Sequence, residues 1–266
     1  MRGQRDGRGT HQVVLTYDGS FPGFLCAAAD FINASRSGGA PPTIRGFASS
    51  EELFDETFAV RCDEARATRL WRRLSRKAGE ASLQTCMEAF LSDLPERENS
   101  IARALARMDN EGGKALDAMD DPDICLVVKA ALRAKGQAHL LKGLIRFSEL
   151  ADGSWYAPIE PDCDVLSLLG DHFAARYPDM RFAIHDRKRN KAILHLPGSP
   201  WRTVDGFSLT SSPESSFSER ERAIQAGWVR YFDTVAIAPR RNPRLQSGHM
   251  PKKYWHLLPE MKPNKK

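Results

Sequence analysis

The chain has 266 residues and a mass of 29.7 kDa, with 41% hydrophobic residues, 27% charged residues and a formal net charge of +5. This composition is typical of a folded globular protein and excludes a fibrous or largely disordered chain. No run approaches the roughly 18 apolar residues that a membrane-spanning helix needs, and no apolar signal core follows the basic N-terminus, so we expect a cytoplasmic protein. One α/β domain is expected over residues 13–260, with any internal boundary near 80–95. A disordered N-terminus over 1–12 and a flexible tail over 261–266 would flank it.

The first third of the sequence alternates between strand and helix signals. Residues 13–17 are β-prone and end at Asp18-Gly19-Ser20, turn residues that can cap a helix beginning near Phe21. A second β-prone run at 58–62 ends at Asp63, which can cap the basic helix that follows. The order β-α-β-α predicts a small α/β layer.

Residues 81–150 follow a helical pattern that is broken near Pro95, Gly112-Gly113 and Pro122, which predicts several central helices. Strand-like runs at 155–159, 181–185 and 192–196 come next, and the last two flank a polar connector that predicts a hairpin. Helices are expected over 162–177 and from Ser218 to about residue 237, where Ser218 and Glu221 fit a capping box. The fold class is therefore α/β, with α+β as the alternative, and C-terminal strands are followed by a helix and a basic tail.

Positive charge is concentrated in the C-terminal part of the chain. From Arg176 onward there are 18 Lys and Arg against 8 Asp and Glu, so the preceding part is net acidic. This asymmetry predicts a polyanionic partner for the C-terminal half.

The five cysteines lie far apart in the sequence, at positions 26, 62, 86, 125 and 163. There is no CxxC motif and no Cys/His pair at zinc spacing. We therefore expect buried thiols in a reducing compartment and neither a metal site nor an iron–sulfur or other cofactor.

The segment 231–260 combines the side-chain types that nucleic-acid-binding proteins use. Guanidinium groups form bidentate hydrogen bonds with phosphate, amides pair with base edges, and aromatic rings stack on bases. The candidate contacts with nucleic acid or with a partner protein are Arg241, Asn242, Arg244, Gln246, Lys252 and Lys253. Tyr254 and Trp255 are expected to anchor the segment on the core. The alternative is a solvated basic tail without a partner.

A polar cluster is expected where the helix over 162–177 meets the hairpin. His172 and Arg176 are four residues apart and share a helix face, while Asp186 and Arg189 lie on the hairpin connector. As a functional site, the cluster would use His172 and Asp186 for proton transfer and the two arginines to hold phosphate. As a structural feature, it would be a buried network that ties the helix to the sheet.

Arg146 stands beside Phe147 where a helix passes into a strand. An arginine next to an aromatic ring can stack on a base. It can equally well cap the carbonyl groups at the end of the helix. Both interpretations stay open at this point.

Six phrases spread along the chain are distinctive in combination. They are YDGSFPGFL at 17–25, LIRFSEL at 144–150, WYAPIEP at 155–161, DVLSLLGDHFAARYPDM at 164–180, DRKR at 186–189, and RRNPRLQSGHMPKKYWHLLPE at 240–260. Together they resemble a bacterial family of proteins assigned to DNA metabolism and DNA repair. The resemblance covers nearly the whole chain.

The resemblance implies a pathway and not a reaction, because the family has no established activity of its own. Its members are typically encoded beside a radical-SAM protein that acts on DNA. Some carry a further C-terminal domain like a uracil-DNA glycosylase, which we expect this chain, ending at Lys266, to lack. Members often have an acidic residue two positions before the histidine in the helix that leads to the RF phrase. Here that position is Gln137, before His139, and this departure weakens a catalytic role for His139.

The leading hypothesis is an accessory protein of bacterial DNA repair that binds DNA through its basic C-terminal face and works with a radical-SAM partner. One alternative is an enzyme that acts on nucleic acid through the cluster of His172, Arg176, Asp186 and Arg189. The other is a pure protein-interaction subunit whose basic tail meets an acidic patch on its partner.

Overall fold

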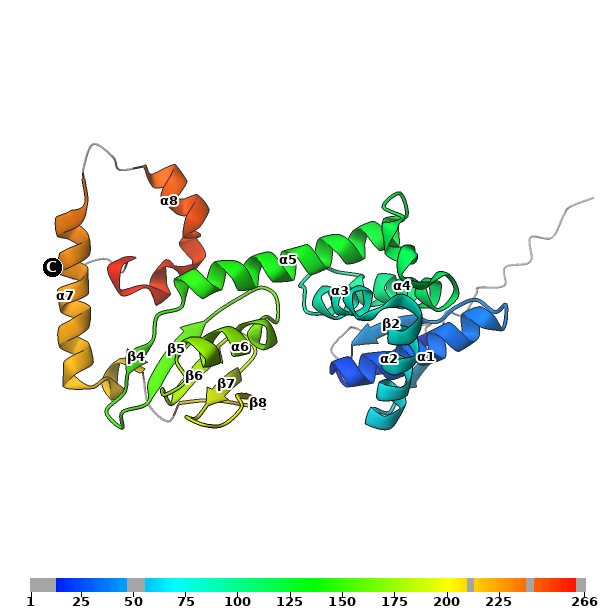
Figure 1. Cartoon of the computed structure of the whole chain (residues 1–266), viewed down its shortest axis with the longest axis horizontal. Helices are drawn as coiled ribbons and strands as arrows, with labels where there is room; N and C mark the ends of the chain where they lie inside the picture. Colours follow the sequence, from blue (N-terminus) through cyan, green and yellow to red (C-terminus); the bar gives the residue numbers. More distant parts are fainter. Residues whose placement is uncertain (1–12, 47–55, 210–212, 238–241, 262–266) are drawn as a thin grey trace, which may run out of the picture. The chain divides into compact units, whose positions relative to one another are not determined.

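The computed structural model describes residues 13–46, 56–209, 213–237 and 242–261, and the chain divides into two compact units, residues 1–134 and 135–266 (Figure 1). The division falls within helix α5 (Pro122–Leu144) and not near residues 80–95. The fold class is mixed α/β, as the sequence predicts. The segments 1–12 and 262–266, for which disorder was expected, lie outside the described residues. Within the described ranges, no helix combines the length and the apolar character that crossing a membrane requires.

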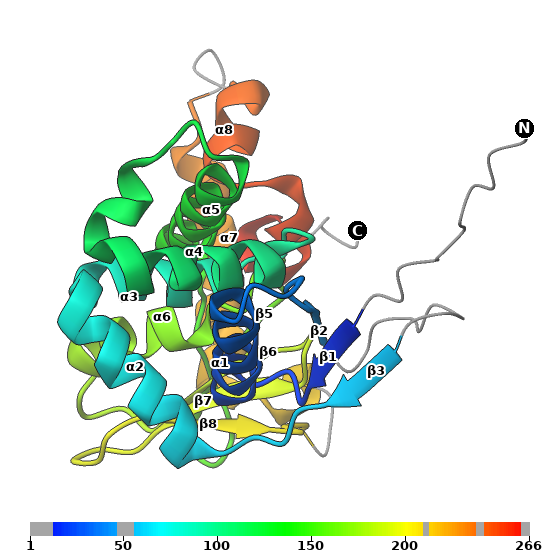
Figure 2. The same cartoon turned by 90° about the vertical axis from the view of Figure 1, so that its right-hand side faces the viewer.

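The first unit is built on a three-stranded parallel sheet with the strand order β2-β1-β3. The strand predicted at 13–17 is β1 (Val13–Tyr17), and beside it lies β3 (Glu56–Ala59), which overlaps only the start of the run predicted at 58–62 (Figure 2). On the other side of β1 is β2 (Thr43–Gly46), which the sequence did not reveal. A run of four residues is too short to show a period, so only its pairing with β1 identifies it.

Helices of the first unit begin where the cap residues predict. The Ser20 hydroxyl accepts a hydrogen bond from the Gly23 amide at 3.0 Å at the start of α1 (Phe21–Arg36). The Asp63 carboxylate accepts one from the Arg66 amide at 3.0 Å at the start of α2 (Glu64–Ala78). The helices and turn that follow are α3 (Glu80–Phe90), α4 (Arg97–Glu111) and η1 (Gly112–Asp117), with breaks near Pro95 and Gly112 as expected.

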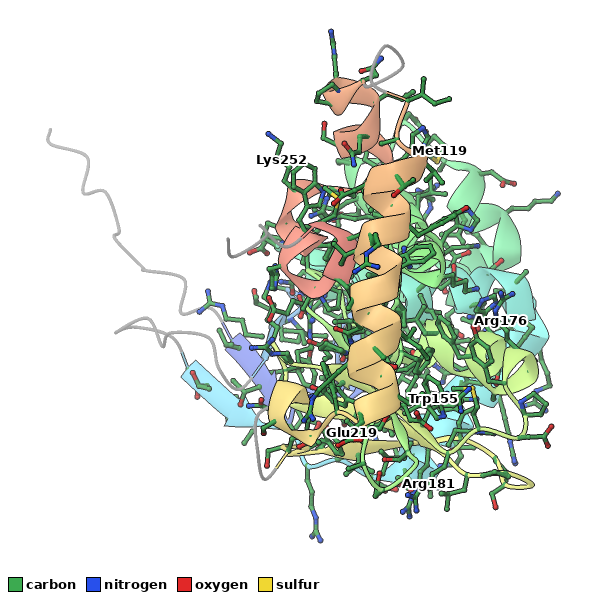
Figure 3. All side chains as sticks on the ribbon, turned by 90° about the vertical axis from the view of Figure 1, so that its left-hand side faces the viewer. Met119, Trp155, Arg176, Arg181, Glu219 and Lys252 are labelled. Carbon is green, nitrogen blue, oxygen red and sulfur yellow. The ribbon has the colours of Figure 1, made fainter. Side chains whose placement is uncertain are left out.

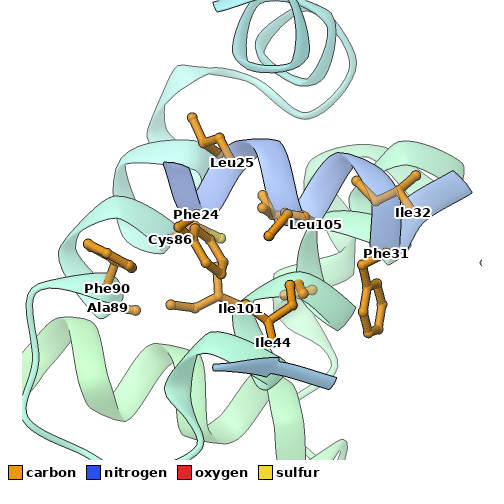
Figure 4. Packing of buried hydrophobic residues seen from close by; sticks show 14 of the residues in the cluster. Phe24, Leu25, Phe31, Ile32, Ile44, Cys86, Ala89, Phe90, Ile101 and Leu105 are labelled. Carbon is orange, nitrogen blue, oxygen red and sulfur yellow. The ribbon is translucent and has the colours of Figure 1, made fainter. Parts of the chain in front are cut away.

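The core of the first unit lies between these helices and the sheet (Figure 4). The rings of Phe24 in α1 and Phe90 in α3 have centroids 5.2 Å apart. Ile44 of β2 and Ile101 and Leu105 of α4 are fully buried beside them. Removal of this apolar surface from water is the main force that holds the helices on so small a sheet.

The second unit contains a five-stranded mixed sheet with the order β4-β5-β6-β7-β8. Its strands are β4 (Ser148–Glu149), β5 (Trp155–Ile159), β6 (Phe182–Asp186), β7 (Lys191–His195) and β8 (Arg202–Asp205). β5 and β6 are parallel and are joined through α6 (Leu166–Arg176), whereas the other neighbours are antiparallel. The predicted hairpin is β6–β7, and the predicted helix begins at Leu166 instead of residue 162.

A glycine in α6 lets the helix pack closely against the loop before β8. The indole of Trp201 lies over Gly170, where an added Cβ would come within 2.3 Å of the ring. The Trp201 Nε1–H also donates a hydrogen bond to the Asp171 carboxylate at 2.6 Å. This contact fixes α6, which carries two of the predicted site residues.

The C-terminal elements are short apart from α7. They are η2 (Pro213–Ser216), α7 (Glu219–Val235), α8 (Pro243–His249), η4 (Lys252–Leu257) and η5 (Pro259–Met261). Helix α7 starts at Glu219, labelled in Figure 3, and Ser218 caps it by accepting from the Glu221 amide at 3.0 Å. The capping box is incomplete, because the Glu221 carboxylate accepts from the Glu149 amide of β4 at 3.2 Å. Glu221 therefore ties the helix to the sheet.

Candidate nucleic-acid interface

A cavity of about 980 Å³ opens in the second unit beside the last turns of α5 and α6. Its polar wall consists of three cations and two imidazoles, Lys142, Arg146, Arg176, His139 and His172. Most of the remaining lining consists of four aromatic side chains, Phe147, Trp155, Phe173 and Tyr177. Within the described part of the chain, no aspartate or glutamate belongs to the lining. A lining of cations and aromatic faces is suited to a ligand with both negative charge and flat rings.

The aromatic wall is held together by edge-to-face packing around Phe147. Its ring centroid lies 5.4 Å from that of Phe173, 5.6 Å from that of Tyr177 and 5.3 Å from that of Phe182 at the start of β6. Such packing favours one arrangement of the rings beyond the burial of their area. The rings are therefore positioned by the core and not by solvent-exposed loops.

Arg176 presents its charge above this wall. Its guanidinium carbon lies 5.5 Å from the Tyr177 ring centroid, and its Nε–H donates to the Tyr177 hydroxyl at 3.2 Å. Arg176 is exposed, whereas Tyr177 is half-buried. The pair offers a guanidinium group and an aromatic ring at adjacent points of the cavity wall.

Arg146 is held on two sides, and the capping role foreseen for it is present. Its Nη1 donates to the Gly143 carbonyl at 3.0 Å at the end of α5. Its Nη2 pairs with the Glu260 carboxylate at 3.0 Å, and the Glu260 side chain is only 2% exposed. Glu260 was missed by the sequence analysis, because nothing in the local pattern connects it to a residue 114 positions earlier.

His172 is the titratable group of the cavity whose protonation is most affected by its surroundings. Partial burial, followed by the charges of Lys142 and Arg176, lowers the pKa of its imidazole below the usual value. The ring is therefore neutral near pH 7 and can accept as well as donate a hydrogen bond. Its edge-to-face contact with Phe173, with centroids 4.9 Å apart, keeps the ring against the aromatic wall.

Residues 95–260 match the family model described as a domain of unknown function, DUF4130. The chain belongs to this family. The DUF4130 region contains the whole cavity and the C-terminal elements as far as Glu260, whereas the parallel sheet of the first unit precedes it.

No curated protein matches the chain. A solved structure of a DHH domain, from a protein described as a member of a family of ribosomal proteins, has 10% sequence identity over 71% of this chain and 74% of its own. Its TM-score of 0.31 is too low to support any argument from that protein to this one.

The four residues of the predicted polar cluster do not converge. His172 and Arg176 lie at the end of α6, whose Phe173 contacts Phe147 beside the start of β6. Asp186 is the last residue of β6, about 13 Å further along the strand at its usual rise. Among the described residues, no hydrogen bond or ion pair joins either side chain of α6 to Asp186 or Arg189.

Asp186 and Arg189 instead belong to a buried structural network, which was the alternative interpretation of the predicted cluster. Asp186 is fully buried, and its carboxylate accepts from the amides of Lys188 and Arg189 in the hairpin turn. It also pairs with the Arg189 guanidinium at 2.9 Å, while Arg189 donates to the carbonyl groups of Pro161 and Asp162. Burial raises the pKa of Asp186, although Arg189 opposes the shift. These bonds tie the turn to the end of β5, and they leave Asp186 out of reach of a substrate.

Two side chains of the C-terminal tail, residues 242–261, contact acidic groups of their own unit. Tyr254 is 1% exposed and anchors the segment, as the sequence suggested. Lys253 pairs with Asp162, and His256 lies 3.0 Å from the Glu160 carboxylate. The ion pair of Lys253 uses up positive charge that was expected to face a polyanion.

Some of the other tail residues predicted to bind nucleic acid make contacts within the tail, and others are exposed. The Asn242 side chain accepts from the Leu245 amide at 3.0 Å and caps α8, and the Gln246 amide donates to the Met261 sulfur at 3.6 Å. Trp255 is half-buried and donates to the Met250 carbonyl at 2.7 Å. Arg244, Lys252 and Lys253 are exposed, and among the described residues only Lys253 of these three forms an ion pair, while Lys252 lies over the Trp255 ring. Arg241 lies outside the described residues.

Gln137 and His139 face different surroundings, because residues two apart on a helix point about 200° apart. The Gln137 side chain accepts from the Cys163 amide at 2.7 Å and donates towards Asp162, whereas His139 lines the cavity. The glutamine therefore has a structural role here. An acidic residue at position 137 would not face His139 within the cavity.

Lys142 is a cavity residue that the sequence analysis missed, although its position carried a signal. His139 and Lys142 are spaced i, i+3 and thus share one face of α5, in the same way as His172 and Arg176 share one face of α6, whereas Arg146 follows the end of α5 at Leu144. The packing of these two faces around Phe147 had no such signal. Among the described residues, no group of three His, Cys, Asp or Glu side chains is arranged to hold a metal ion.

Proposed function

We propose that the second unit binds single-stranded nucleic acid, and DNA in particular, through the cavity beside α5 and α6. The observation that carries the proposal is the lining, in which cations and aromatic rings occur together and to which the described part of the chain contributes no carboxylate. Phosphate groups would pair with Arg176 and Lys142, and unstacked bases would lie against the aromatic wall. Stacking of a base on an aromatic side chain contributes about 1–3 kcal/mol and depends little on sequence.

A single strand is favoured over an intact duplex for a physical reason. The faces of bases in a duplex are covered by their neighbours, so an aromatic wall has nothing to stack on until a base is unstacked. The exposed Arg244 and Lys252 of the tail would add phosphate contacts outside the cavity. Lys253 would not, because Asp162 neutralises it.

The role in DNA repair that the family resemblance implies is part of the same proposal. The protein would hold unpaired DNA and present it to a radical-SAM partner. Co-purification of the two proteins, followed by crosslinking to damaged DNA, tests this part. A complex that survives nuclease treatment and forms without DNA would instead favour a pure protein-interaction subunit.

The direct test is the binding of a fluorescein-labelled single-stranded oligonucleotide and of its duplex, measured by anisotropy over a range of salt concentrations. We expect tighter binding of the single strand, and a log affinity that falls linearly with log salt through counterion release. Arg176→Gln should weaken binding about tenfold and reduce the salt slope by about 0.7, the value for one phosphate contact on a single strand.

Arg230→Gln is the matched control, because Arg230 of α7 is exposed, carries the same charge and lies outside the cavity. It should change the affinity less than twofold. Equal losses in the two variants, or no binding of the wild type at low salt, would contradict the proposal.

An enzyme that acts on nucleic acid is a second candidate, and the neutral imidazole of His172 inside the cavity favours it. The acid–base partner foreseen for it, Asp186, is buried elsewhere, and His139 is the other imidazole in the lining. Turnover of lesion-containing oligonucleotides that is lost in His172→Ala, with binding retained, would support this candidate. Unchanged turnover in that variant would remove His172 from the chemistry.

A further inference from the structure

Helix α2 of the first unit carries a cationic face that no part of the proposed function uses. The apolar residues Ala67, Leu70 and Leu74 are buried in the core of the unit. The rest of the helix surface carries six cations, Arg66, Arg69, Arg72, Arg73, Arg76 and Lys77. Only one acidic residue, Glu64 in the first turn, belongs to the helix.

Two of these cations are fixed in place by a buried carboxylate. Asp109 of α4 has a fully buried side chain, and Lys77 lies 2.9 Å from one of its oxygens while Arg73 lies 3.5 Å from the same atom. Arg36, at the end of α1, pairs with the other oxygen. One negative charge thus faces three positive ones, and the cations remain 36–45% exposed.

The electrostatics of Asp109 show that it is ionised at neutral pH. Burial by itself would raise the pKa of this carboxyl, but the hydrogen bond from Lys77 and the charges of Arg73 and Arg36 bring it below the usual value. The excess positive charge at this point is therefore permanent and held by three helices. It is not a set of freely moving side chains.

A row of exposed arginines lies on the side of the helix that faces away from its buried residues. Arg69, Arg72 and Arg76 are exposed and spaced i, i+3, i+7, and they form no hydrogen bond or ion pair with the described part of the chain. At 1.5 Å per residue the row is about 10 Å long. Arg66 is excluded from it because Asp30 neutralises it.

We propose that this face of α2 is a second nucleic-acid surface, which contacts the phosphate backbone of DNA without reading its sequence. The inference rests on the proposed function and extends it to the first unit. A duplex carries one negative charge per about 1.7 Å of its axis, so a row of this length passes several phosphates. Five of the six cations are arginines, whose forked guanidinium group matches the geometry of phosphate.

The burial of the apolar face argues against a membrane surface as the partner. An interfacial helix needs its apolar side free to enter the lipid, whereas Leu70 and Leu74 are 5% and 0% exposed. The exposed row consists of arginines, which also argues against a hydrophobic protein groove as the partner. A polyanion that contacts only the cationic side fits both observations.

The test compares two double variants of the full-length chain that remove the same charge. Arg72→Gln/Arg76→Gln removes the centre and end of the row, and Lys114→Gln/Lys129→Gln removes two exposed lysines elsewhere in the first unit. With a labelled duplex that has a single-stranded overhang, we expect the arginine variant to bind about tenfold more weakly. Its salt slope should be lower by up to about 1.8, or 0.9 for each lost phosphate contact on duplex DNA. Thermal unfolding checks that both variants are folded.

Equal affinities in the two double variants would overturn the inference. So would binding to phosphatidylserine vesicles that is lost in the arginine variant while its DNA binding is kept. The cavity variant Arg176→Gln separates this inference from the proposed function. If Arg176→Gln weakens binding and the arginine variant of α2 does not, the second surface is wrong and the cavity stands; the reverse result rejects the cavity and keeps the α2 surface.

Discussion

The cavity and the C-terminal tail of the second unit contain the same kinds of side chain and differ in what neutralises them. In the tail, Lys253 pairs with Asp162 and His256 contacts Glu160. In the cavity, no carboxylate from the described ranges belongs to the lining around Arg176 and Lys142. The density of cations and aromatic residues in a sequence therefore does not identify a polyanion surface. The positions of the acidic residues in the folded unit decide it.

The same comparison gives the tail a different role from the one its sequence suggests. The buried ring of Tyr254 anchors it, and Glu260 near its end holds Arg146 at the edge of the cavity. The tail acts as a brace for the cavity, and its few exposed cations are secondary. Four predictions test this division of roles, in order of decreasing effect.

The largest effect is expected from removal of the tail's anchor. Tyr254→Ala empties a site that is 1% exposed, so the free energy of unfolding should fall by about 3–5 kcal/mol, as for other large buried aromatic residues. Urea denaturation measures it. Lys252→Ala, two residues earlier and exposed, should change the stability by less than about 0.5 kcal/mol. A cost below about 1 kcal/mol for Tyr254→Ala would show that the tail is not a brace.

The next effect concerns the helix that carries the cavity cations. Gly170→Ala places a methyl group against the Trp201 indole, and the resulting overpacking should lower the free energy of unfolding by about 1–3 kcal/mol. Gly136→Ala is its control, because nothing lies within 4 Å of the added atom in the helix α5. The free energy of unfolding of that variant should rise by about 0.5–1 kcal/mol, because alanine has a higher helix propensity than glycine. Equal melting temperatures for the two variants would contradict the close contact of Trp201 with α6.

A smaller effect is expected from pH. The pKa of His172 is lowered in the free protein by burial and by Lys142 and Arg176, and a bound phosphate would raise it. Binding then takes up a proton, so affinity for a single strand should increase several-fold as the pH falls from 7.5 to 5.5, since one pKa unit corresponds to about tenfold. His172→Gln should flatten this dependence. An unchanged pH profile in the variant would place His172 outside the contact.

The smallest effect separates the two regions most directly. Lys253→Gln should leave the affinity for single-stranded DNA within about twofold of the wild type, because the ion pair with Asp162 already neutralises the lysine and surface pairs contribute about 1 kcal/mol or less. Anisotropy under the conditions used for Arg176→Gln makes the two values comparable. A larger loss for Lys253→Gln than for Arg176→Gln would reverse the assignment of cavity and tail.

The local features of the fold were predictable because their causes are local. Ser20, Asp63 and Ser218 cap helices through bonds to amides three residues away, and the β6–β7 hairpin follows from two β-prone runs around a polar turn. The shared helix face of His172 and Arg176 likewise follows from their spacing. The fold class and three of the cavity residues, Arg146 included, could thus be obtained from the sequence alone.

The pairing of charges could be decided only by the tertiary structure. Arg146 and Glu260 are 114 positions apart, and Lys253 and Asp162 are 91 apart. Asp186 lies ten residues after Arg176, yet β6 carries it to the opposite end of the strand from the cavity. The periodicity of the sequence does not reveal these contacts, because long-range contacts are set by the packing of whole elements around a common core. The sequence therefore determined which side chains could bind a polyanion, and the fold determined which of them are still unneutralised.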